Sequence, residues 1–357
     1  MSPDQRFMAL ALSLGRRGLG RVWPNPAVGC VIVAQGRTVG RGWTADGGRP
    51  HAETRALAQA GTASKGATVY VTLEPCAHHG QTPPCAAALF AAGVARVVVA
   101  TGDPDPRVAG RGIALLRAAG IAVDVGCLEA EARADHAGFL SRIQRGRPFV
   151  TLKLAQSLDG RIAMPSGESQ WITGPEARRA VHLLRARHDA VMVGAGTVRA
   201  DDPMLTVRDI GVTRQPVRVV LSRGLDLTLD SALARSARDV PLWLCHGPDA
   251  PSPAWVALGA KSLPYPVEQG VGGALAVLAE QGITRVFCEG GGGLAASLLA
   301  ADVVDQIVLY SAGLLIGADG VPGLAALGVN RLADVPRFRL ADLQQIGADT
   351  MSRWMRA

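Results

Sequence analysis

The sequence predicts an α/β protein of two domains, each with its own sheet covered by helices. Short apolar runs of the kind that form buried strands alternate with helical stretches through both halves of the chain. At 357 residues the chain is long for one domain and comfortable for two, and 48% hydrophobic residues with 19% charged residues can supply two cores. We expect one domain over residues 1–126, a connecting helix and linker over 127–147, and a second domain over 148–357.

The first domain contains four apolar runs that predict strands, with alanine-rich helical stretches between them. The strands are expected at residues 28–33, 67–73, 94–100 and 121–125, and helices at 52–60 and 86–92. Residues 129–145 then form a charged stretch that predicts one connecting helix, ended by Gly146-Arg147-Pro148.

The second domain repeats this alternation. Strands are expected at residues 149–154, 190–194, 217–221, 242–245, 285–288 and 306–310. Two glycine loops follow strands, at 194–197 and 290–293, and a helix is expected at 294–301. A strand, a glycine loop and a helix N-terminus bring backbone N–H groups close to a phosphate. Neither loop has the G-x-G-x-x-G spacing, so each alone is more simply a tight turn without a ligand, but two at strand ends favour a cofactor crevice.

A cluster of metal-binding residue types lies between residues 51 and 85. His51 and Glu53 form an H-x-E pair, and Cys76 and Cys85 follow with eight residues between them. An H-x-E pair followed by P-C-x-x-C is the signature of hydrolytic zinc deaminases, in which the imidazole and two thiolates bind zinc and the glutamate carries protons. The longer cysteine spacing separates this chain from most such enzymes. We expect a catalytic zinc site with Glu53 as its acid–base group.

A structural zinc site is the alternative interpretation of the same residues. Such a site needs a fourth protein ligand, which His78 or His79 would provide. Glu53 has no purpose in a structural site, which favours catalysis, and the two histidines are then expected at the pocket mouth or in a solvated loop. The remaining cysteines lie in apolar runs and are expected in the cores: Cys30, Cys127, Cys245 and Cys288.

Composition narrows the cellular setting. Six cysteines without a paired pattern argue against a disulfide scaffold and favour a reducing cytoplasm. The apolar segment 7–14 is too short to span a bilayer, and its flanking charges have the wrong order for a secretory signal, so we expect no membrane association.

Charge narrows the class of partner. The net charge of +7 comes almost wholly from arginine, because the only lysines are Lys65, Lys153 and Lys261. Aromatic residues make up 4% of the chain, and no basic run with interleaved aromatics is present, which argues against nucleic acid and favours a phosphorylated small molecule. A general preference for arginine over lysine would give the same composition, so the net charge alone does not establish an anionic partner.

Several long motifs resemble those of the bifunctional deaminase/reductases of riboflavin biosynthesis, and the resemblance covers nearly the whole chain. In the first domain the motifs are Pro24-Asn25-Pro26-Ala27-Val28-Gly29, His51-Ala52-Glu53, and Glu74-Pro75-Cys76-Ala77-His78-His79-Gly80 through Thr82-Pro83-Pro84-Cys85. In the second they are Lys153-Leu154-Ala155, Ser157-Leu158-Asp159-Gly160, residues 167–174 (GESQWITG) and residues 194–203 (GAGTVRADDP).

The resemblance implies two consecutive reactions on one phosphorylated pyrimidine. The first domain would have the cytidine-deaminase-like three-layer α/β/α fold and would bind one Zn²⁺ per chain. It would hydrolyse the 2-amino group of 2,5-diamino-6-(5-phosphoribosylamino)pyrimidin-4(3H)-one. The second, dihydrofolate-reductase-like α/β domain would use NADPH to reduce the ribosyl group of the resulting 5-amino-6-(5-phosphoribosylamino)uracil to ribityl. We also expect a homo-oligomer, a dimer or a tetramer.

The resemblance also implies roles for individual residues. In the deaminase site His51, Cys76 and Cys85 match the zinc ligands, Glu53 matches the proton shuttle, and Asn25 is expected to bind the pyrimidine ring. In the reductase site the NADPH-contacting set is Ala155, Trp171, Thr197, Asp201, Ser222, Gly291, Gly292, Gly293, Leu294, Ala295, Ala296 and Ser297. The substrate-contacting set there is Ser169, Arg185, Leu205, Arg208 and Glu289, whose arginines suit a sugar phosphate.

Parts of the reductase site stay open. Lys153 and Asp201 would either assist proton transfer to the ring-opened sugar imine or only position it, and Ser222 with Arg223 would meet the 2′-phosphate of NADPH. Gly313 stands where the family often has a lysine. Residues 226–272 match only weakly, so we assign no site residue there.

Two other functions are consistent with parts of the sequence. A base deaminase acting on tRNA or a free nucleoside would need the two-residue cysteine spacing and a basic, aromatic-bearing surface, and the sequence has neither. A metal-dependent binding module without catalysis would not need Glu53. Replacing Glu53 by glutamine distinguishes the two hypotheses. A catalytic site should lose its deaminase activity, whereas a binding module should be unaffected.

Overall fold

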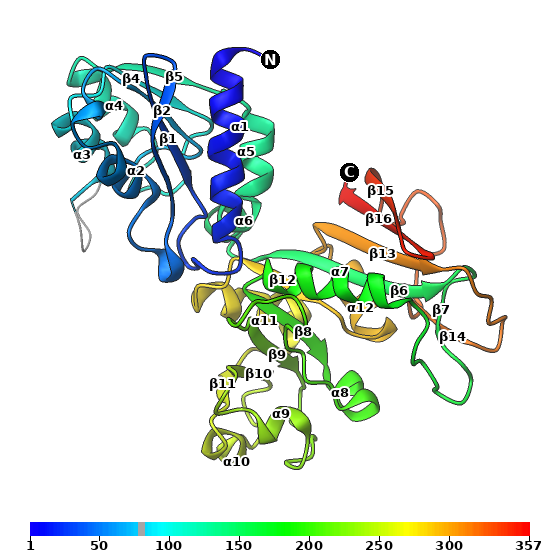
Figure 1. The fold of residues 1–357 in the computed structure, drawn as a ribbon. Coiled ribbons are helices and arrows are strands. Elements are labelled where there is room, and N and C mark those ends of the chain that lie inside the picture. The colour runs from blue at the N-terminus through cyan, green and yellow to red at the C-terminus, as the bar shows by residue number, and fades with distance from the viewer. Residues whose placement is uncertain (78–82) are drawn as a thin grey trace. The chain divides into compact units, whose positions relative to one another are not determined.

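The computed structural model describes residues 1–77 and 83–357 and contains two compact units, Met1–Gly146 and Arg147–Ala357 (Figure 1). Each unit has its own sheet and its own apolar cores. The second unit begins beside the expected boundary at residue 148, whereas the first extends beyond the expected end at residue 126.

The first unit is a five-stranded sheet between two layers of helices. Its strands are β1 (Gly29–Ala34), β2 (Arg37–Trp43), β3 (Thr68–Val71), β4 (Arg96–Val99) and β5 (Ala122–Val125). Its helices are α1 (Pro3–Gly15), α2 (Ala52–Ala60), α3 (Cys85–Ala91), α4 (Arg111–Ala118), α5 (Glu129–Asp135) and α6 (Ala137–Arg145). The order is β2-β1-β3-β4-β5, with β1 antiparallel to both neighbours and β3, β4 and β5 parallel.

Alternation along β1 explains the two helix layers. Cys30 and Ile32 point into the core shared with α2 and α3, whereas Val31 and Val33 point into the core shared with α1. All four side chains are buried, which explains why the sequence of the strand is a continuous apolar run. That run is what predicted the strand. In Figure 1, α1 and α5 cover one face of the sheet and α2, α3 and α4 the other.

Residues 129–145, expected as one connecting helix, form two helices that complete the first unit. α5 and α6 are separated by His136. Ala132 of α5 is buried with α1, and Phe139 and Leu140 of α6 are buried in the core that contains α2 and α3. These apolar side chains hold the segment against the first sheet, which is why the compact unit ends at residue 146.

The second unit is built on a nine-stranded sheet and a separate two-stranded sheet. Its strands are β6 (Phe149–Ser157), β7 (Arg161–Ala163), β8 (Ala190–Gly194), β9 (Val217–Leu221), β10 (Leu242–His246), β11 (Lys261–Pro264), β12 (Arg285–Cys288), β13 (Gln306–Ala312), β14 (Val321–Pro322), β15 (Phe338–Ile346) and β16 (Asp349–Arg356). Its helices are α7 (Pro175–Ala186), α8 (Ala195–Asp201), α9 (Ala232–Arg235), α10 (Pro253–Ala257), α11 (Gly270–Glu280) and α12 (Gly292–Ala300).

The large sheet is parallel over most of its width. Its order is β11-β10-β9-β8-β12-β6-β13-β16-β15, and β7 pairs with β14 in the small sheet. The strands from β11 to β13 are parallel, whereas β16 and β15 are antiparallel to their neighbours. The six strands expected from the sequence are all parallel ones, because helices bury both faces and the sequence there is apolar. β15 and β16 were not expected, since β15 is largely exposed and rich in polar residues.

The burial of the cysteines and the length of the helices bear on two further expectations. Cys30, Cys245 and Cys288 are buried, as expected for core residues, and Cys127 is partly buried. None of the helices that the structure describes is long and apolar enough to cross a membrane.

Candidate active sites

Three metal-binding side chains of the first unit converge at the beginnings of two helices. His51 is the N-cap residue of α2, Cys85 is the first residue of α3, and Cys76 lies in the loop that follows β3. Their ligand atoms all lie within 4.8 Å of one another. The backbone N–H of Cys85 donates to Cys76 Sγ at 3.3 Å, which holds the two thiols in place.

The spacing of these atoms fits a zinc ion. His51 Nδ1 lies 3.3 Å from Cys85 Sγ and 3.7 Å from Cys76 Sγ. Tetrahedral zinc, with bonds of about 2.1 Å to nitrogen and about 2.3 Å to sulfur, keeps its ligands about 3.5 Å apart. One nitrogen and two thiolates form a donor set that zinc prefers, and three protein ligands leave a position for water or substrate. The described residues therefore fit a catalytic zinc centre.

The hydrogen bonds among these residues favour the metal-binding form of one thiol. A hydrogen bond with Cys85, together with that from His51, lowers the pKa of Cys76 to about 4. The same hydrogen bond and burial raise the pKa of Cys85. Two thiolates this close together repel each other, so a bound cation favours the state in which both are ionised.

Glu53 lies beside the thiols in a dry environment. It is only 4% exposed and belongs to the first turn of α2, two residues after His51. Burial raises the pKa of its carboxyl group, and the neighbouring His51 opposes that rise. A carboxyl group with a raised pKa can both accept and donate a proton near neutral pH, as a proton shuttle must.

Two of the candidate zinc ligands, His51 and Cys76, line a pocket of about 150 Å³ within the first unit, together with Glu53. Asn25 lines the same pocket, whereas His78 and His79 lie outside the described residues. Four charged residues that the sequence did not single out also line it: Arg49, Asp103, Asp105 and Arg107. No spacing pattern marks them, because they come from loops that only the fold brings to the pocket.

Glu74, part of the motif around Cys76, anchors the loop that carries this ligand. Its carboxylate accepts from the backbone N–H groups of Gly110 at 3.0 Å and Gly112 at 2.9 Å. These groups lie at the N-terminus of α4, where an anion also meets the positive end of the helix dipole. The contact requires glycine at residue 112, since a Cβ there would lie 1.9 Å from the Pro75 carbonyl oxygen.

In the second unit, the two expected glycine loops have different structures. α12 begins at Gly292, directly after the glycines that follow β12 and earlier than expected. The expected loop at 194–197 is instead the start of α8, because the chain coils at once and buries Val198. The Gly291 N–H donates to the Thr197 hydroxyl at 3.2 Å, so the two segments do meet.

The expected NADPH-contacting residues lie on separate segments of the second unit. Ala155 is on β6, Thr197 and Asp201 are on α8, and Trp171 is an exposed residue before α7 with the Arg178 guanidinium 4.6 Å from its ring centre. The remaining ones are at the start of α12 and after β9: Gly291, Gly292, Gly293, Leu294, Ala295, Ala296, Ser297 and Ser222.

Several members of this set are already engaged within the protein. Ala295 and Ala296 are buried, and the Ser297 hydroxyl donates to the carbonyl of Gly293 at 3.0 Å. The Ser222 hydroxyl donates to Asp226 Oδ1 at 3.2 Å. Ala295, Ala296 and Ser222 are therefore buried parts of the α12 and β9 ends of the site, whereas Ser297 is exposed on α12.

The expected substrate residues form a linked cluster. Arg185 binds Glu289 with two parallel contacts, Nε to Oε1 at 2.5 Å and Nη2 to Oε2 at 3.0 Å, and the two side chains are only 13% and 9% exposed. Arg185 Nη1 also donates to the Thr206 carbonyl at 2.7 Å. Arg208 donates to the Thr206 hydroxyl at 3.1 Å and, through its backbone N–H, to His182 Nδ1 at 3.2 Å. The sequence did not point to Thr206 or His182.

Leu205 and Ser169 complete the substrate set. Leu205 is 3% exposed and has a φ of 53°, so the backbone beside Thr206 turns sharply while its side chain enters the core. Ser169 is half-buried in the segment before α7.

Lys153 and Asp201 influence each other's charge. Burial lowers the pKa of Lys153, and the carboxylates of Glu289 and Asp201 oppose this. Burial raises the pKa of Asp201, and Lys153 opposes that rise. Both shifts move the groups toward exchange of a proton near neutral pH, which is characteristic of functional sites.

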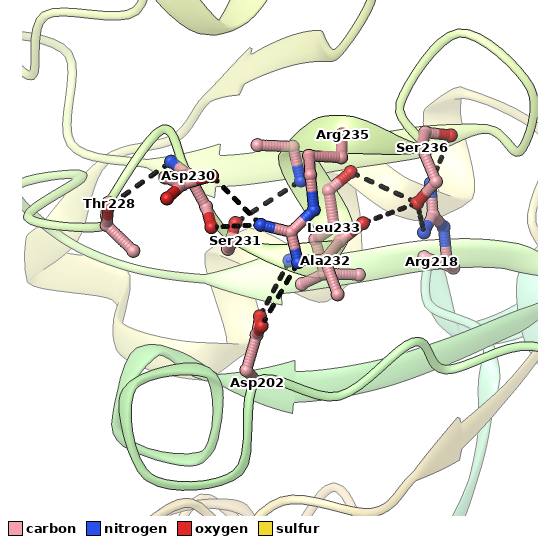
Figure 2. A network of polar contacts seen from close by, with 10 residues as sticks. Asp202, Arg218, Thr228, Asp230, Ser231, Ala232, Leu233, Arg235 and Ser236 are labelled. Carbon is pink, nitrogen blue, oxygen red and sulfur yellow. Dashed lines mark hydrogen bonds and ion pairs between the residues drawn. The ribbon is translucent and has the colours of Figure 1, made fainter.

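A polar network holds the chain that leaves α8 (Figure 2). Arg218 of β9 is completely buried, and burial lowers its pKa to about 10. Its guanidinium donates to Ser236 Oγ at 2.7 Å, to the Val240 carbonyl at 2.6 Å and to the Met204 carbonyl at 3.4 Å. The Nη1 and Nη2 groups of this buried arginine meet oxygen acceptors, which stabilises its charge, whereas its Nε has no hydrogen-bond partner.

Asp202 ties the same segment to α9, as Figure 2 shows. Its carboxylate accepts from the backbone N–H of Ala232 at 2.7 Å and lies 3.7 Å from Arg235. Asp202 follows Asp201 directly, so α9 and β9 together position the segment that carries Asp201 and Leu205. Residues 226–272, in which we assigned no site residue, thus hold the segment that carries candidate site residues.

Comparison with known proteins gives matches to both units. Residues 148–352 match the RibD C-terminal domain, and residues 1–101 match the cytidine and deoxycytidylate deaminase zinc-binding region. The chain is 44% identical to the riboflavin biosynthesis protein RibD of Escherichia coli (strain K12), over 97% of both chains. It is 40% identical to that of Aquifex aeolicus, over 97% of this chain and 96% of the relative.

Solved structures give the same result. Acinetobacter baumannii RibD, form 1, is 40% identical, with a TM-score of 0.90 over 99% of both chains. A Thermotoga maritima protein is 34% identical, with a TM-score of 0.89 over 99% of both chains. That protein is described as a diaminohydroxyphosphoribosylaminopyrimidine deaminase/5-amino-6-(5-phosphoribosylamino)uracil reductase.

Proposed function

The chain belongs to the RibD family of bifunctional deaminase/reductases of riboflavin biosynthesis, and on that premise we propose which of its residues perform each reaction. The observation that carries the proposal is the convergence of His51, Cys76 and Cys85 beside the buried Glu53. For the substrates we extend to this chain the reactions for which the Thermotoga maritima relative is named.

In the deaminase site, three residues hold the metal and two others handle the pyrimidine. Zinc bound by His51, Cys76 and Cys85 would supply an activated water for attack on the carbon that bears the 2-amino group. Glu53 takes the proton of the attacking water and passes it to the departing ammonia. Its burial supports this role, because burial raises the pKa of the carboxyl group. A raised pKa makes the carboxyl group better able both to accept and to donate a proton. Asn25 orients the ring through its amide.

In the reductase site, the cofactor is NADPH, which supplies the hydride when bound. The junction of Thr197 and Gly291 with the N-terminus of α12 supports this, since backbone N–H groups there suit a pyrophosphate. Lys153 and Asp201, whose charges influence each other, are the two candidates for the proton that accompanies reduction.

The arginines of the reductase site have different tasks. Because Arg185 already forms a two-point ion pair with Glu289, its role is to fix the position of that carboxylate and of Thr206. Arg208 forms hydrogen bonds with Thr206 and His182, neither of which is a carboxylate. Its guanidinium is therefore better suited than that of Arg185 to bind the sugar phosphate.

A homo-oligomer remains part of the proposal. β15 is an edge strand of the nine-stranded sheet, and it exposes Leu340 and Leu343 by 48% and 62%. Exposed leucines on an unpaired edge favour pairing with a second copy. Sedimentation of the chain measures the oligomeric state directly. Two thiol ligands that must stay reduced also support the expected cytoplasmic location.

Zinc content measured alongside the two half-reactions tests the proposed function. We expect about one zinc per chain, release of ammonia from the phosphoribosylamino-pyrimidine, and oxidation of NADPH by the deaminated product. Removing zinc with a chelator should stop ammonia release and leave NADPH oxidation unchanged, because the ligands belong to the first unit alone. Zinc with neither reaction would direct the search to nucleosides and tRNA.

A further inference from the structure

Residues 204–208 carry Leu205 and Arg208 of the candidate substrate set and belong to no helix or strand. A segment without ladder hydrogen bonds keeps one conformation only when other groups bind its backbone N–H and carbonyl groups. The side chains of Leu205, Thr206 and Val207 are buried, whereas Arg208 is exposed. The segment is therefore anchored in the core directly before the residue that presents a guanidinium to solvent.

Four side chains from elsewhere in the second unit bind the backbone of residues 204–208: Arg218, Arg185, Gln215 and His182. Gln215 binds Val207 at two points, accepting from its N–H at 2.7 Å and donating to its carbonyl at 3.0 Å. This contact takes the place of the hydrogen bonds that a neighbouring strand would supply. The contact of His182 is the last of the four along the chain, and it lies at Arg208 itself.

His182 of α7 holds the end of the segment as a neutral imidazole. The Arg208 N–H donates to His182 Nδ1 at 3.2 Å, so Nδ1 carries no proton and the ring hydrogen is on Nε2. Burial lowers the pKa of His182, and the guanidinium groups of Arg185 and Arg208 lower it further. The carboxylates of Glu289 and Asp209 oppose these effects. The lowered pKa agrees with a ring that accepts a hydrogen bond near neutral pH.

The Arg208 guanidinium has hydrogens left for a ligand. Its only hydrogen bond to another described residue runs from Nη1 to the Thr206 hydroxyl at 3.1 Å. A guanidinium has five N–H hydrogens, so four are left for other acceptors. Arg185, by contrast, is bound to Glu289 at two points. Because the Arg208 side chain is exposed and long, the position of its backbone decides where these hydrogens can reach.

We propose that His182 is a positioning residue of the reductase site, which holds the Arg208 backbone so that the guanidinium meets the phosphate of the substrate. This role rests on the proposed function, in which Arg208 binds that phosphate. An arginine whose backbone is held in place beforehand binds more tightly, since less of the chain has to be ordered on binding. In the competing interpretations, His182 only packs on α7, or it donates from Nε2 to the substrate itself.

The kinetics of reduction by His182 variants separate packing from positioning. His182→Phe keeps a ring but lacks the acceptor, and we expect KM for the phosphorylated aminouracil to rise about 10-fold. The value of kcat should change less than about twofold, because no reacting group is altered. His182→Asn places an amide oxygen near the position of Nδ1 and should restore most of the affinity. An unchanged KM in His182→Phe, or an equal loss in both variants, overturns the proposal.

A double substitution tests whether His182 acts through Arg208. Arg208→Gln alone should raise KM about 10- to 100-fold, because charge-assisted hydrogen bonds are lost. Adding His182→Phe to that chain should raise KM no further, since no guanidinium is left to position. If the two losses multiply, His182 contacts the substrate itself and the positioning role is wrong. Leu183→Phe adds a ring at the next, exposed residue of α7 and should leave KM unchanged.

A binding measurement without turnover separates this role from the proposed function. Calorimetric titration of the full chain with ribose 5-phosphate, and with ribose as the control, measures the phosphate contact directly. The binding lost in Arg208→Gln belongs to the reductase site, and His182→Phe should weaken that binding about 10-fold. If the chain reduces no phosphorylated aminouracil, the proposed substrate is wrong, but this weakening would still support the role of His182. Binding that does not depend on His182 overturns it.

Discussion

The two candidate sites differ in how far along the chain their parts are spread. The deaminase site takes its zinc ligands and Glu53 from residues 51–85, at the beginnings of α2 and α3. The reductase site takes its residues from β6, α7, α8, β12 and α12, which span most of the second unit. In the compact site, each chemical role belongs to one side chain. The dispersed site depends on ion pairs and hydrogen bonds that hold distant segments together.

This difference predicts different responses to mutation. In the deaminase site, a change of one side chain should remove one chemical step and leave the fold unchanged. In the reductase site, a change in Arg185, Glu289 or Arg218 should affect stability and activity together, because these residues join segments. Substitutions at Glu53, Glu289, Arg218 and Asp103 test this contrast.

Glu53→Gln should give the largest effect and confine it to one reaction. Loss of a positioned acid–base group typically costs about 100- to 10,000-fold in rate, so ammonia release should fall by that factor. NADPH oxidation should be unchanged, because Glu53 belongs to the first unit. Rates of both half-reactions and zinc content of the variant provide the check. A parallel loss of reduction with zinc retained would contradict the independence of the two sites.

Glu289→Gln should weaken both the stability and the activity of the second unit. The change leaves the buried Arg185 without its charged partner, which costs about 3 kcal/mol in the free energy of unfolding. Reduction should fall while ammonia release persists. Denaturant unfolding followed with both activities measures this. The exposed pair of Arg353 and Asp342 is the control, since Arg353→Gln should cost at most about 1 kcal/mol.

Arg218→Met should act on the reductase from a distance. The Val240 and Ser236 carbonyls would lose a charged donor, which costs about 2 kcal/mol in the free energy of unfolding. Because the Met204 carbonyl also loses its contact, the segment around Asp201 should loosen and KM of the reductase should rise. Thermal unfolding and steady-state reduction check the two parts. A stability loss with unchanged KM would limit Arg218 to the core.

Asp103→Asn should give the smallest effect, a gain in stability that depends on pH. Burial raises the pKa of Asp103 from 3.8 to about 6, so the folded chain resists its ionisation. The cost is absent below about pH 4, grows as the pH rises to about 6 and is complete above it. The variant should be more stable by about 1 kcal/mol at pH 8 and no more stable at pH 4. Unfolding curves at both pH values decide this.

The local parts of the fold and of the deaminase site were predictable from sequence. The buried strands β1, β3, β8, β9 and β12 are rich in valine and other apolar residues, with single charged residues in β9 and β12, so each was expected close to its observed bounds. Strands β2 and β15 were missed because exposed charged and polar residues interrupt their apolar pattern. The division of residues 129–145 into two helices was also missed, since only packing against the first unit reveals which side chains are buried.

From the sequence alone one could predict the candidate zinc ligands, the candidate proton shuttle and the two-domain α/β organisation, because metal-binding residue types at short spacing and buried strands leave local patterns. Only the tertiary structure decided which charged residues meet. The pairing of Arg185 with Glu289 and that of the Arg218 side chain with the Val240 carbonyl join residues far apart in the chain. Asp105 and Arg107 are neighbours in sequence, but only the fold places them on the wall of the zinc pocket. The sequence gives the sign of each residue's charge. The burial and the partner that set the strength of its electrostatic interactions depend on the folded chain.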